Sequence, residues 1–130
     1  MNEKMLIDAA IAAMKNSYSP YSGFCVGAAL LSECGNVYTG ANVENSSFSV
    51  TSCAERSALF AAVSAGERKF VAIAVVGGKS GEITDFCPPC GVCRQALSEF
   101  CTPDARVYLF DGKDVKSLTL GELLPESFSL

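Results

Sequence analysis

An unbroken apolar run from Phe70 to Val76 constrains the fold of this chain more than any other segment. Its residues are apolar throughout and rich in β-branched side chains, with no polar position alternating between them. Successive side chains of a strand point to opposite faces of a sheet, so a strand of this kind has no face left for water. The run therefore predicts a strand that is buried on both faces.

The segments on either side of this run alternate between helical and strand patterns. In chain order the predicted elements are a helix over 3–16, strands over 26–31 and 37–41, a helix over 51–65, the strand over 70–76, a loop over 77–86, a helix over 90–101, a strand over 107–110 and a short helix over 119–124. Thr51 or Ser52 is predicted to cap the helix over 51–65. This alternation predicts an α/β layered architecture in which helices pack on a sheet.

Length and charge limit the classes of function. A chain of 130 residues, of which 49% are hydrophobic and spread along its length, predicts a single domain over 1–130. The net charge is −4 and the basic residues are scattered, so no basic stripe is available for the phosphates of a nucleic acid. No stretch approaches the roughly 20 apolar residues that a membrane span needs. We expect a cytoplasmic protein with neither a nucleic-acid nor a membrane partner.

The cysteine and histidine content restricts the chemistry further, because the chain has seven cysteines and no histidine. Ser-His-Asp and Cys-His catalysis are thereby excluded, and a transition metal must be held by thiolates. An odd number of cysteines also argues against a framework of disulfides. We expect reduced thiols, with Cys25, Cys34 and Cys101 behaving as small apolar groups.

Cys90 and Cys93 place two thiols on one face of the first turn of a predicted helix. Zinc needs at least three protein ligands, and Cys53 is the leading candidate for the third because it also precedes a predicted helix. The positive ends of both helix dipoles favour thiolates at these positions. Three thiolates leave one tetrahedral position for water, which is typical of a catalytic zinc site and not of a closed structural one.

A carboxylate beside that water completes the predicted site. Glu55, two residues after Cys53, is placed to take a proton from water and to deliver it to a leaving group. Three thiolates overcompensate the charge of Zn²⁺, so Arg56 and Arg94 are candidates to donate hydrogen bonds to the thiolates. Glu55 also has a purely structural interpretation, because Ser52-Cys-Ala-Glu55 matches a helix capping box.

Two segments, Cys53-Ala-Glu-Arg56 and Pro89-Cys90-Gly-Val-Cys93-Arg-Gln95, resemble the small homotetrameric cytidine deaminases. They carry the zinc-deaminase signature, in which a metal ligand stands two positions before a glutamate and Pro-Cys-x-x-Cys follows. Further segments extend the resemblance over nearly the whole chain: Ser19 to Phe24, Val26 to Leu30, Gly40 to Asn45, Glu99 to Phe100 and Leu123 to Pro125. The resemblance implies a central mixed β-sheet of about five strands covered by helices.

The resemblance also implies an enzyme, a hydrolase acting on the cyclic amidine C–N bond of cytidine and deoxycytidine in pyrimidine salvage. Zinc, one ion per chain, would be held by Cys53, Cys90 and Cys93. Zinc-bound hydroxide would attack C4 of the base while Glu55, as proton shuttle, protonates N3. Ammonia would then leave, with uridine or deoxyuridine as the product.

Other residues match positions that bind the nucleoside in that family. Asn42 and Glu44 correspond to residues that hydrogen-bond the ribose 3′-hydroxyl, and Phe24 corresponds to a ring packed near the base. The backbone N–H of Ala54 corresponds to the donor to the base carbonyl. Phe128 resembles a terminal phenylalanine that reaches a neighbouring subunit's base, which implies a homotetramer with shared active sites.

The chain departs from the family's pattern at two positions. Phe48 stands where the family often has a tyrosine, whose hydroxyl can bond near the ribose 5′ end. Pro88 replaces a serine, but the contact expected there uses a backbone carbonyl, which proline keeps.

Several alternatives remain open on the residues alone. Cys90 and Cys93 without their context also fit a redox pair or half of a structural zinc knuckle. Cys87 has the same spacing to Cys90, but the two prolines between them are predicted to turn the Cys87 thiol away from the Cys90–Cys93 pair. A deaminase of a cytosine-bearing antibiotic such as blasticidin S is a second enzyme hypothesis. A non-catalytic zinc or redox module is a third, and editing of polynucleotides is a fourth that the acidic charge disfavours.

Overall fold

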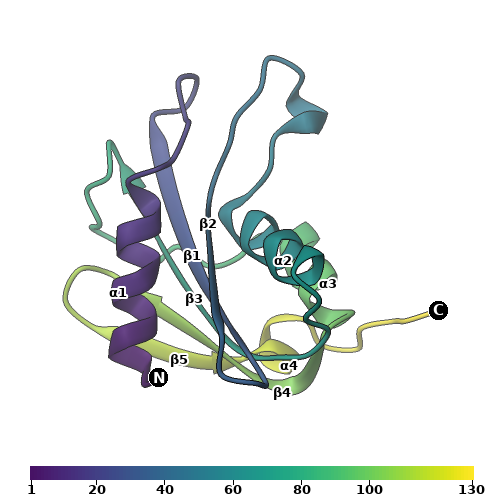
Figure 1. The fold of residues 1–130 in the computed structure, drawn as a ribbon. Coiled ribbons are helices and arrows are strands. Elements are labelled where there is room, and N and C mark those ends of the chain that lie inside the picture. The colour runs from purple at the N-terminus through teal and green to yellow at the C-terminus, as the bar shows by residue number, and fades with distance from the viewer.

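The strand predicted from the apolar run, β3, lies at the centre of a five-stranded sheet in the computed structural model, which describes all 130 residues (Figure 1). The strands are β1 (Phe24–Ser32), β2 (Val37–Ala41), β3 (Phe70–Lys79), β4 (Cys101–Phe110) and β5 (Val115–Thr119). The helices are α1 (Glu3–Met14), α2 (Ala54–Ser64), α3 (Gly91–Ser98) and α4 (Leu120–Leu123), with a 3-10 turn η1 at Phe48–Val50. The strand order is β2-β1-β3-β4-β5, and only the β3–β4 pair is parallel, so the expected mixed sheet is confirmed.

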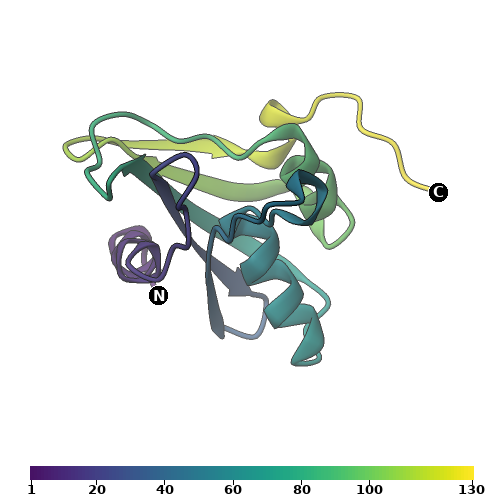
Figure 2. The same ribbon diagram turned by 90° about the horizontal axis from the view of Figure 1, so that it is seen from above.

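Helices cover both faces of the sheet, and β3 is buried between them as predicted. On one face Ile73 and Val75 pack with residues of α2, α3 and α4. On the other face Ala74 and Val76 pack with α1. Figure 2 shows α1 alone on its side of the sheet, with α2 and α3 together on the other side. The helices that follow the signature cysteines therefore share one face.

The structure corrects the predicted boundaries of β3 and α3. The predicted loop over 77–86 begins only at Ser80, because Gly77 and Gly78 continue β3 and pair with Val26 and Cys25 of β1. The helix predicted over 90–101 ends at Ser98, and Cys101 already belongs to β4. Glycine lowers the strand propensity of a segment, but the ladder to β1 overrides that local preference.

The sequence pattern did not predict β5. Its residues, Val115–Thr119, are mostly exposed and form an edge strand that pairs only with β4. An edge strand with little burial has no continuous apolar signal, so its pairing depends on the neighbouring strand. The first helix also ends at Met14 and not at residue 16, whereas the predicted short helix over 119–124 is present as α4 and begins with a capping box formed by Thr119 and Glu122.

Gly40 in β2 allows α2 to lie directly against the sheet. A Cβ atom at Gly40 would lie 2.4 Å from the backbone nitrogen of Ala58 and 2.6 Å from the carbonyl oxygen of Ala54. We therefore expect Gly40→Ala to push α2 outward and to lower the free energy of unfolding by about 1–3 kcal/mol, measured by chemical denaturation. Gly91→Ala is the control, because a Cβ there meets no atom within 4 Å. An equal loss in both variants would contradict this explanation.

The connection between β2 and α2 projects from the body of the protein in Figure 1, and the residues after α4 project in Figures 1 and 2. Each carries an exposed phenylalanine: Phe48 is 84% exposed and Phe128 is 69% exposed. Exposed rings of this size are available for contact with another molecule. Separately, none of the helices combines the length and the apolar character that crossing a membrane requires.

Candidate metal centre

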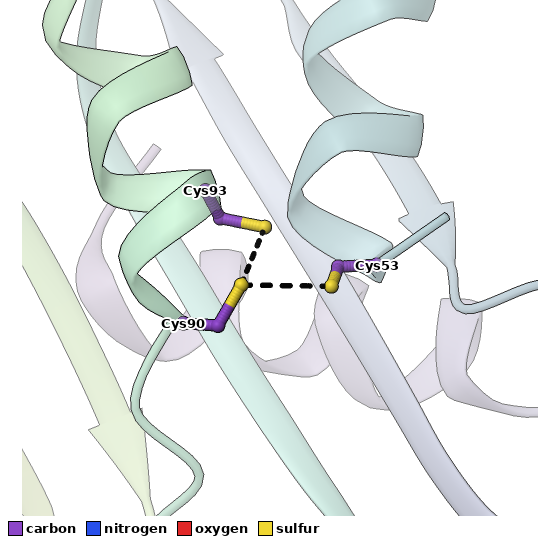
Figure 3. Close-up of side chains that lie close together, drawn as sticks. All are labelled: Cys53, Cys90 and Cys93. Atoms are coloured by element: carbon purple, nitrogen blue, oxygen red, sulfur yellow. Dashed lines mark hydrogen bonds between the residues drawn. The ribbon is translucent and has the colours of Figure 1, made fainter. Parts of the chain in front are cut away.

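Cys53, Cys90 and Cys93 meet between the N-terminal ends of α2 and α3 (Figure 3). Cys53 is the residue before α2, Cys90 is the residue before α3, and Cys93 lies in the first turn of α3. Cys90 Sγ lies 3.7 Å from Cys53 Sγ and 3.4 Å from Cys93 Sγ. The structure thus brings together the cysteines that the sequence predicted to form one site.

The spacing of the sulfur atoms fits a tetrahedral zinc ion. With Zn–S bonds of about 2.3 Å, two thiolates at the tetrahedral angle lie about 3.8 Å apart. All three Sγ atoms lie within 4.8 Å of one another, and no aspartate, glutamate or fourth cysteine belongs to the group. A set of three ligands leaves one coordination position for water, as in catalytic zinc sites.

The thiol cluster favours a first negative charge and resists a second one. A hydrogen bond from the Cys93 thiol, supported by one from Arg56, lowers the pKa of Cys53 to about 5. The same hydrogen bond, together with burial, raises the pKa of Cys93. A divalent cation relieves this conflict because it neutralises neighbouring thiolates together. The donor set therefore suits the exchange of thiol protons for a metal ion.

Glu55 lies in the first turn of α2 and is only 4% exposed. The capping interpretation of this residue is wrong, as is the predicted cap at Thr51 or Ser52, because Cys53 is the N-cap and no side chain caps the helix. The Ser52 hydroxyl donates to the carbonyl oxygen of Cys53. Burial, and then the charge of Cys53, raises the pKa of the Glu55 carboxyl. A carboxyl in this state is suited to taking up and releasing a proton.

Arg56 lies against the cluster from the same turn of α2. Its Nη2 atom donates to Cys53 Sγ at 3.4 Å and to the carbonyl oxygen of Thr51 at 3.5 Å. The contact with Cys53 raises the pKa of Arg56, so the guanidinium stays charged. Its buried Nε atom has no hydrogen-bond partner. Arg56 therefore brings positive charge to the thiolates.

Arg94 does not donate to the thiolates, so that prediction is wrong. Its Nε atom donates to the carbonyl oxygen of Pro89 at 2.7 Å, and its Nη1 atom donates to that of Leu123 at 2.9 Å. Because Pro89 directly precedes Cys90, the guanidinium ties the loop that carries a cluster cysteine to α4.

A cavity of about 210 Å³ opens beside the cluster. Three of the predicted substrate-binding residues line it together with the predicted catalytic glutamate and two of the cysteines: Asn42, Glu44, Ala54, Glu55, Cys53 and Cys90. Pro88, for which the resemblance implies a contact through the backbone carbonyl, also lines the cavity. The sequence did not assign the remaining lining residues to a substrate site: Val26, Thr51, Ser52 and Cys87. Their position follows from tertiary packing, and no local spacing signals it.

Asn42 is 9% exposed, and its amide is largely committed to the protein. Its oxygen accepts hydrogen bonds from Val26 N–H, at 2.9 Å, and from the Ser17 hydroxyl. Its nitrogen donates to the carbonyl oxygen of Phe24 at 2.8 Å. An amide nitrogen carries two protons, so one N–H of Asn42 is left for a ligand. As the first residue of α2, Ala54 has a backbone N–H without an acceptor inside the helix.

The two predicted aromatic contacts lie outside the lining of the cavity. The ring of Phe24 lies over Gly77 beside Cys87; a Cβ at Gly77 would lie 3.1 Å from Phe24 Cε2 and 2.9 Å from Cys87 Sγ. Burial raises the pKa of Cys87 to about 11, so that its thiol stays neutral. Phe128 lies on the projecting C-terminal segment, where Gln95 Nε2 donates to its carbonyl oxygen at 3.4 Å. The structure does not bring Phe128 to this chain's own cavity.

Known proteins share both the sequence and the fold. Residues 1–109 match the family model of the cytidine and deoxycytidylate deaminase zinc-binding region. Cytidine deaminase of Halalkalibacterium halodurans is 49% identical over an alignment of 130 positions that covers 99% of this chain and 96% of that protein. Blasticidin-S deaminase of Bacillus cereus is 34% identical over 109 residues, 80% of this chain and 76% of that protein.

Comparison of the fold with solved structures also finds cytidine deaminases. The crystal structure of cytidine deaminase from Burkholderia pseudomallei is 46% identical, with a TM-score of 0.90 over 98% of this chain and 100% of that one. The cysteine cluster lies within the residues that the zinc-binding family model covers. The chain therefore belongs to the cytidine and deoxycytidylate deaminase family.

Proposed function

We propose that this protein is a zinc-dependent cytidine deaminase that hydrolyses cytidine and deoxycytidine to uridine and deoxyuridine, releasing ammonia. The observation that carries the proposal is the cluster of Cys53, Cys90 and Cys93 with Glu55 beside it in one cavity. Relatives named cytidine deaminase match along nearly their whole length, which supports the same reaction here. Such a reaction belongs to pyrimidine salvage.

In this proposal Cys53, Cys90 and Cys93 hold the zinc ion, which when bound supplies a Lewis acid that activates water near neutral pH. Glu55 accepts the proton of that water and passes it to N3 of the pyrimidine ring, and a later proton to the departing amine. Burial supports this role because a carboxyl removed from bulk water holds a proton more readily than an exposed one.

The remaining residues orient the nucleoside. The free N–H of Asn42 and the carboxylate of Glu44 bind a ribose hydroxyl, and the Ala54 N–H binds the carbonyl of the base. The position of these residues around one cavity supports the assignment. Phe24, which is 39% exposed and lies beside the cavity residue Cys87, packs near the base.

We also propose that the protein acts in the cytoplasm as a homotetramer in which Phe128 completes a neighbour's active site. The exposure of Phe128 on a projecting segment supports this assembly. The net charge of −4 supports the absence of a nucleic-acid partner. Light scattering of the purified chain tests the assembly, and a monomeric mass would contradict it.

A direct test combines metal analysis with a spectroscopic assay. We expect the purified protein to contain close to one zinc ion per chain and to convert cytidine to uridine, followed by ultraviolet absorbance. Competition between cytidine and blasticidin S separates this function from the antibiotic deaminase, a candidate because of the similarity to the Bacillus cereus enzyme. Zinc-loaded protein that deaminates no cytosine nucleoside would contradict the proposed function while sparing the metal site.

Arg56→Ala is expected to lower zinc affinity and activity by about tenfold, because the thiolates lose the donor that offsets their excess charge. Zinc retention in competition with a chelator and the rate of cytidine deamination measure the two effects. Arg68→Ala is the matched control, because Arg68 is exposed and donates only to backbone carbonyls. Wild-type zinc affinity together with wild-type activity in Arg56→Ala would show that the contact with Cys53 has no such role.

A further inference from the structure

The hydroxyl of Ser22 connects two of the residues that are proposed to bind the substrate. It accepts a hydrogen bond from the backbone N–H of Phe24 at 3.0 Å and donates one to Glu44 Oε2. Because the Phe24 N–H can only donate and the Glu44 carboxylate can only accept, the direction of both hydrogen bonds is fixed. Ser22 therefore holds the Glu44 carboxylate in a defined place relative to Phe24.

The Glu44 carboxylate is occupied almost entirely by this turn. The backbone N–H groups of Tyr21 and Ser22 donate to Oε1 at 3.0 and 3.1 Å, and the Ser22 hydroxyl donates to Oε2. Each carboxylate oxygen offers two lone-pair positions, so Oε1 is filled and Oε2 retains one. That remaining position is where Glu44 can accept a hydrogen bond from a ligand, and the Ser22 hydroxyl sets its direction.

The backbone of the turn is fixed independently of the Ser22 hydroxyl. Lys79 Nζ, from the end of β3, donates to the carbonyl oxygen of Ser22 at 2.7 Å. The Gly23 N–H donates to the carbonyl oxygen of Ser19 at 2.9 Å, and the Ser80 N–H donates to that of Gly23 at 2.7 Å. Removal of the hydroxyl alone therefore leaves the turn attached to the sheet.

Ser22 and Glu44 also differ in their position relative to the metal centre. Glu44 lines both the cavity beside the cysteines and a neighbouring hollow of about 430 Å³. Ser22 lines only the neighbouring hollow. The hydroxyl thus reaches the cavity beside the cysteines only through Glu44.

We propose that Ser22 is a positioning residue for the sugar of the substrate, aiming the free lone pair of Glu44 at a ribose hydroxyl. This inference rests on the proposed function, because it requires a nucleoside in the cavity. Ser22 acts on the strength of nucleoside binding and leaves the chemical step unchanged, because it lies outside the cavity that contains Glu55.

The experiment compares two substrates on the zinc-loaded, full-length protein. With cytidine, Ser22→Ala is expected to raise KM by about tenfold and to change kcat by less than about twofold, since a charge-assisted hydrogen bond no longer orders Glu44. With 2′,3′-dideoxycytidine, which keeps the 5′-hydroxyl but has no 3′-hydroxyl for Glu44, both constants are expected to match those of the wild type. Ser22→Thr, which keeps a hydroxyl, is expected to restore the KM for cytidine.

Two further variants separate positioning from a general structural effect. Ser46→Ala removes a hydroxyl that forms a hydrogen bond with the Tyr21 hydroxyl at 2.6 Å and none with Glu44, so its kinetics should be unchanged. In a Glu44→Ala background, which has no side-chain acceptor for the Ser22 hydroxyl to orient, Ser22→Ala should add no further loss. An active wild type in which Ser22→Ala weakens both nucleosides equally, or lowers mainly kcat, would overturn the positioning role alone. A zinc-loaded wild type that deaminates neither nucleoside would overturn the proposed function and this role with it.

Discussion

Replacing Glu55 by glutamine is expected to lower the rate of cytidine deamination by about 10²–10⁴-fold while the zinc content stays at the wild-type level. Glutamine keeps the volume and the hydrogen-bonding shape of glutamate, but its amide cannot carry a proton between water and the substrate near neutral pH. The side chain is only 4% exposed, so the neighbouring side chains should hold the amide where the carboxyl was. The loss should therefore appear in kcat, measured by ultraviolet absorbance at saturating cytidine.

Glu3→Gln is the matched control for this variant. Glu3 also occupies the first turn of a helix, α1, but is exposed and far along the chain from the cysteines of the metal cluster. Both substitutions remove a favourable charge–dipole contact at a helix N-terminus, whereas only Glu55→Gln removes a proton carrier. Glu55→Gln that keeps more than about a third of wild-type kcat would rule out Glu55 as the proton shuttle.

The parts of this protein that local spacing encodes could be predicted from the sequence. Cys90 and Cys93 are one helical turn apart, so any helix that begins between them brings their side chains together. The burial of β3 also follows from a local feature, the unbroken apolar run. The convergence of Cys53 on that pair is a tertiary event. Its place before a predicted helix made it the leading candidate, and the combined signature, which resembles a known family, supported that choice.

The features that the sequence did not predict depend on contacts between distant segments. β5 forms because β4 offers an edge for pairing, and the extension of β3 through Gly77 depends on the ladder to β1. Arg94 bonds to a carbonyl of α4 because the fold places that helix within reach. The contact between Ser22 and Glu44 spans 22 positions of the sequence, and serine in a turn has many other local uses.

Cys90→Ser is expected to abolish zinc retention without weakening the metal-free folded chain. Cys90 is exposed and is the N-cap of α3, where its side chain makes no capping hydrogen bond. Serine is among the preferred N-cap residues, so the variant should lose a metal ligand and gain a helix cap of about 0.5–1 kcal/mol. A hydroxyl is a far poorer zinc ligand than a thiolate, so the substitution leaves only two of the three protein ligands. We expect the zinc content after dialysis to fall at least tenfold, with deaminase activity falling in parallel.

Chelation distinguishes this loss of metal from unfolding. Because zinc binds the folded cluster, a strong chelator should lower the melting temperature of the wild type, whereas Cys90→Ser should melt at one temperature with or without it. Cys34→Ser is the control, since Cys34 is also an exposed thiol but lies in the turn between β1 and β2 and outside the cluster; it should behave like the wild type in every assay. If Cys90→Ser kept its zinc and its sensitivity to the chelator, the cluster would not be the metal centre, because the Cys90 sulfur lies close to both of the others.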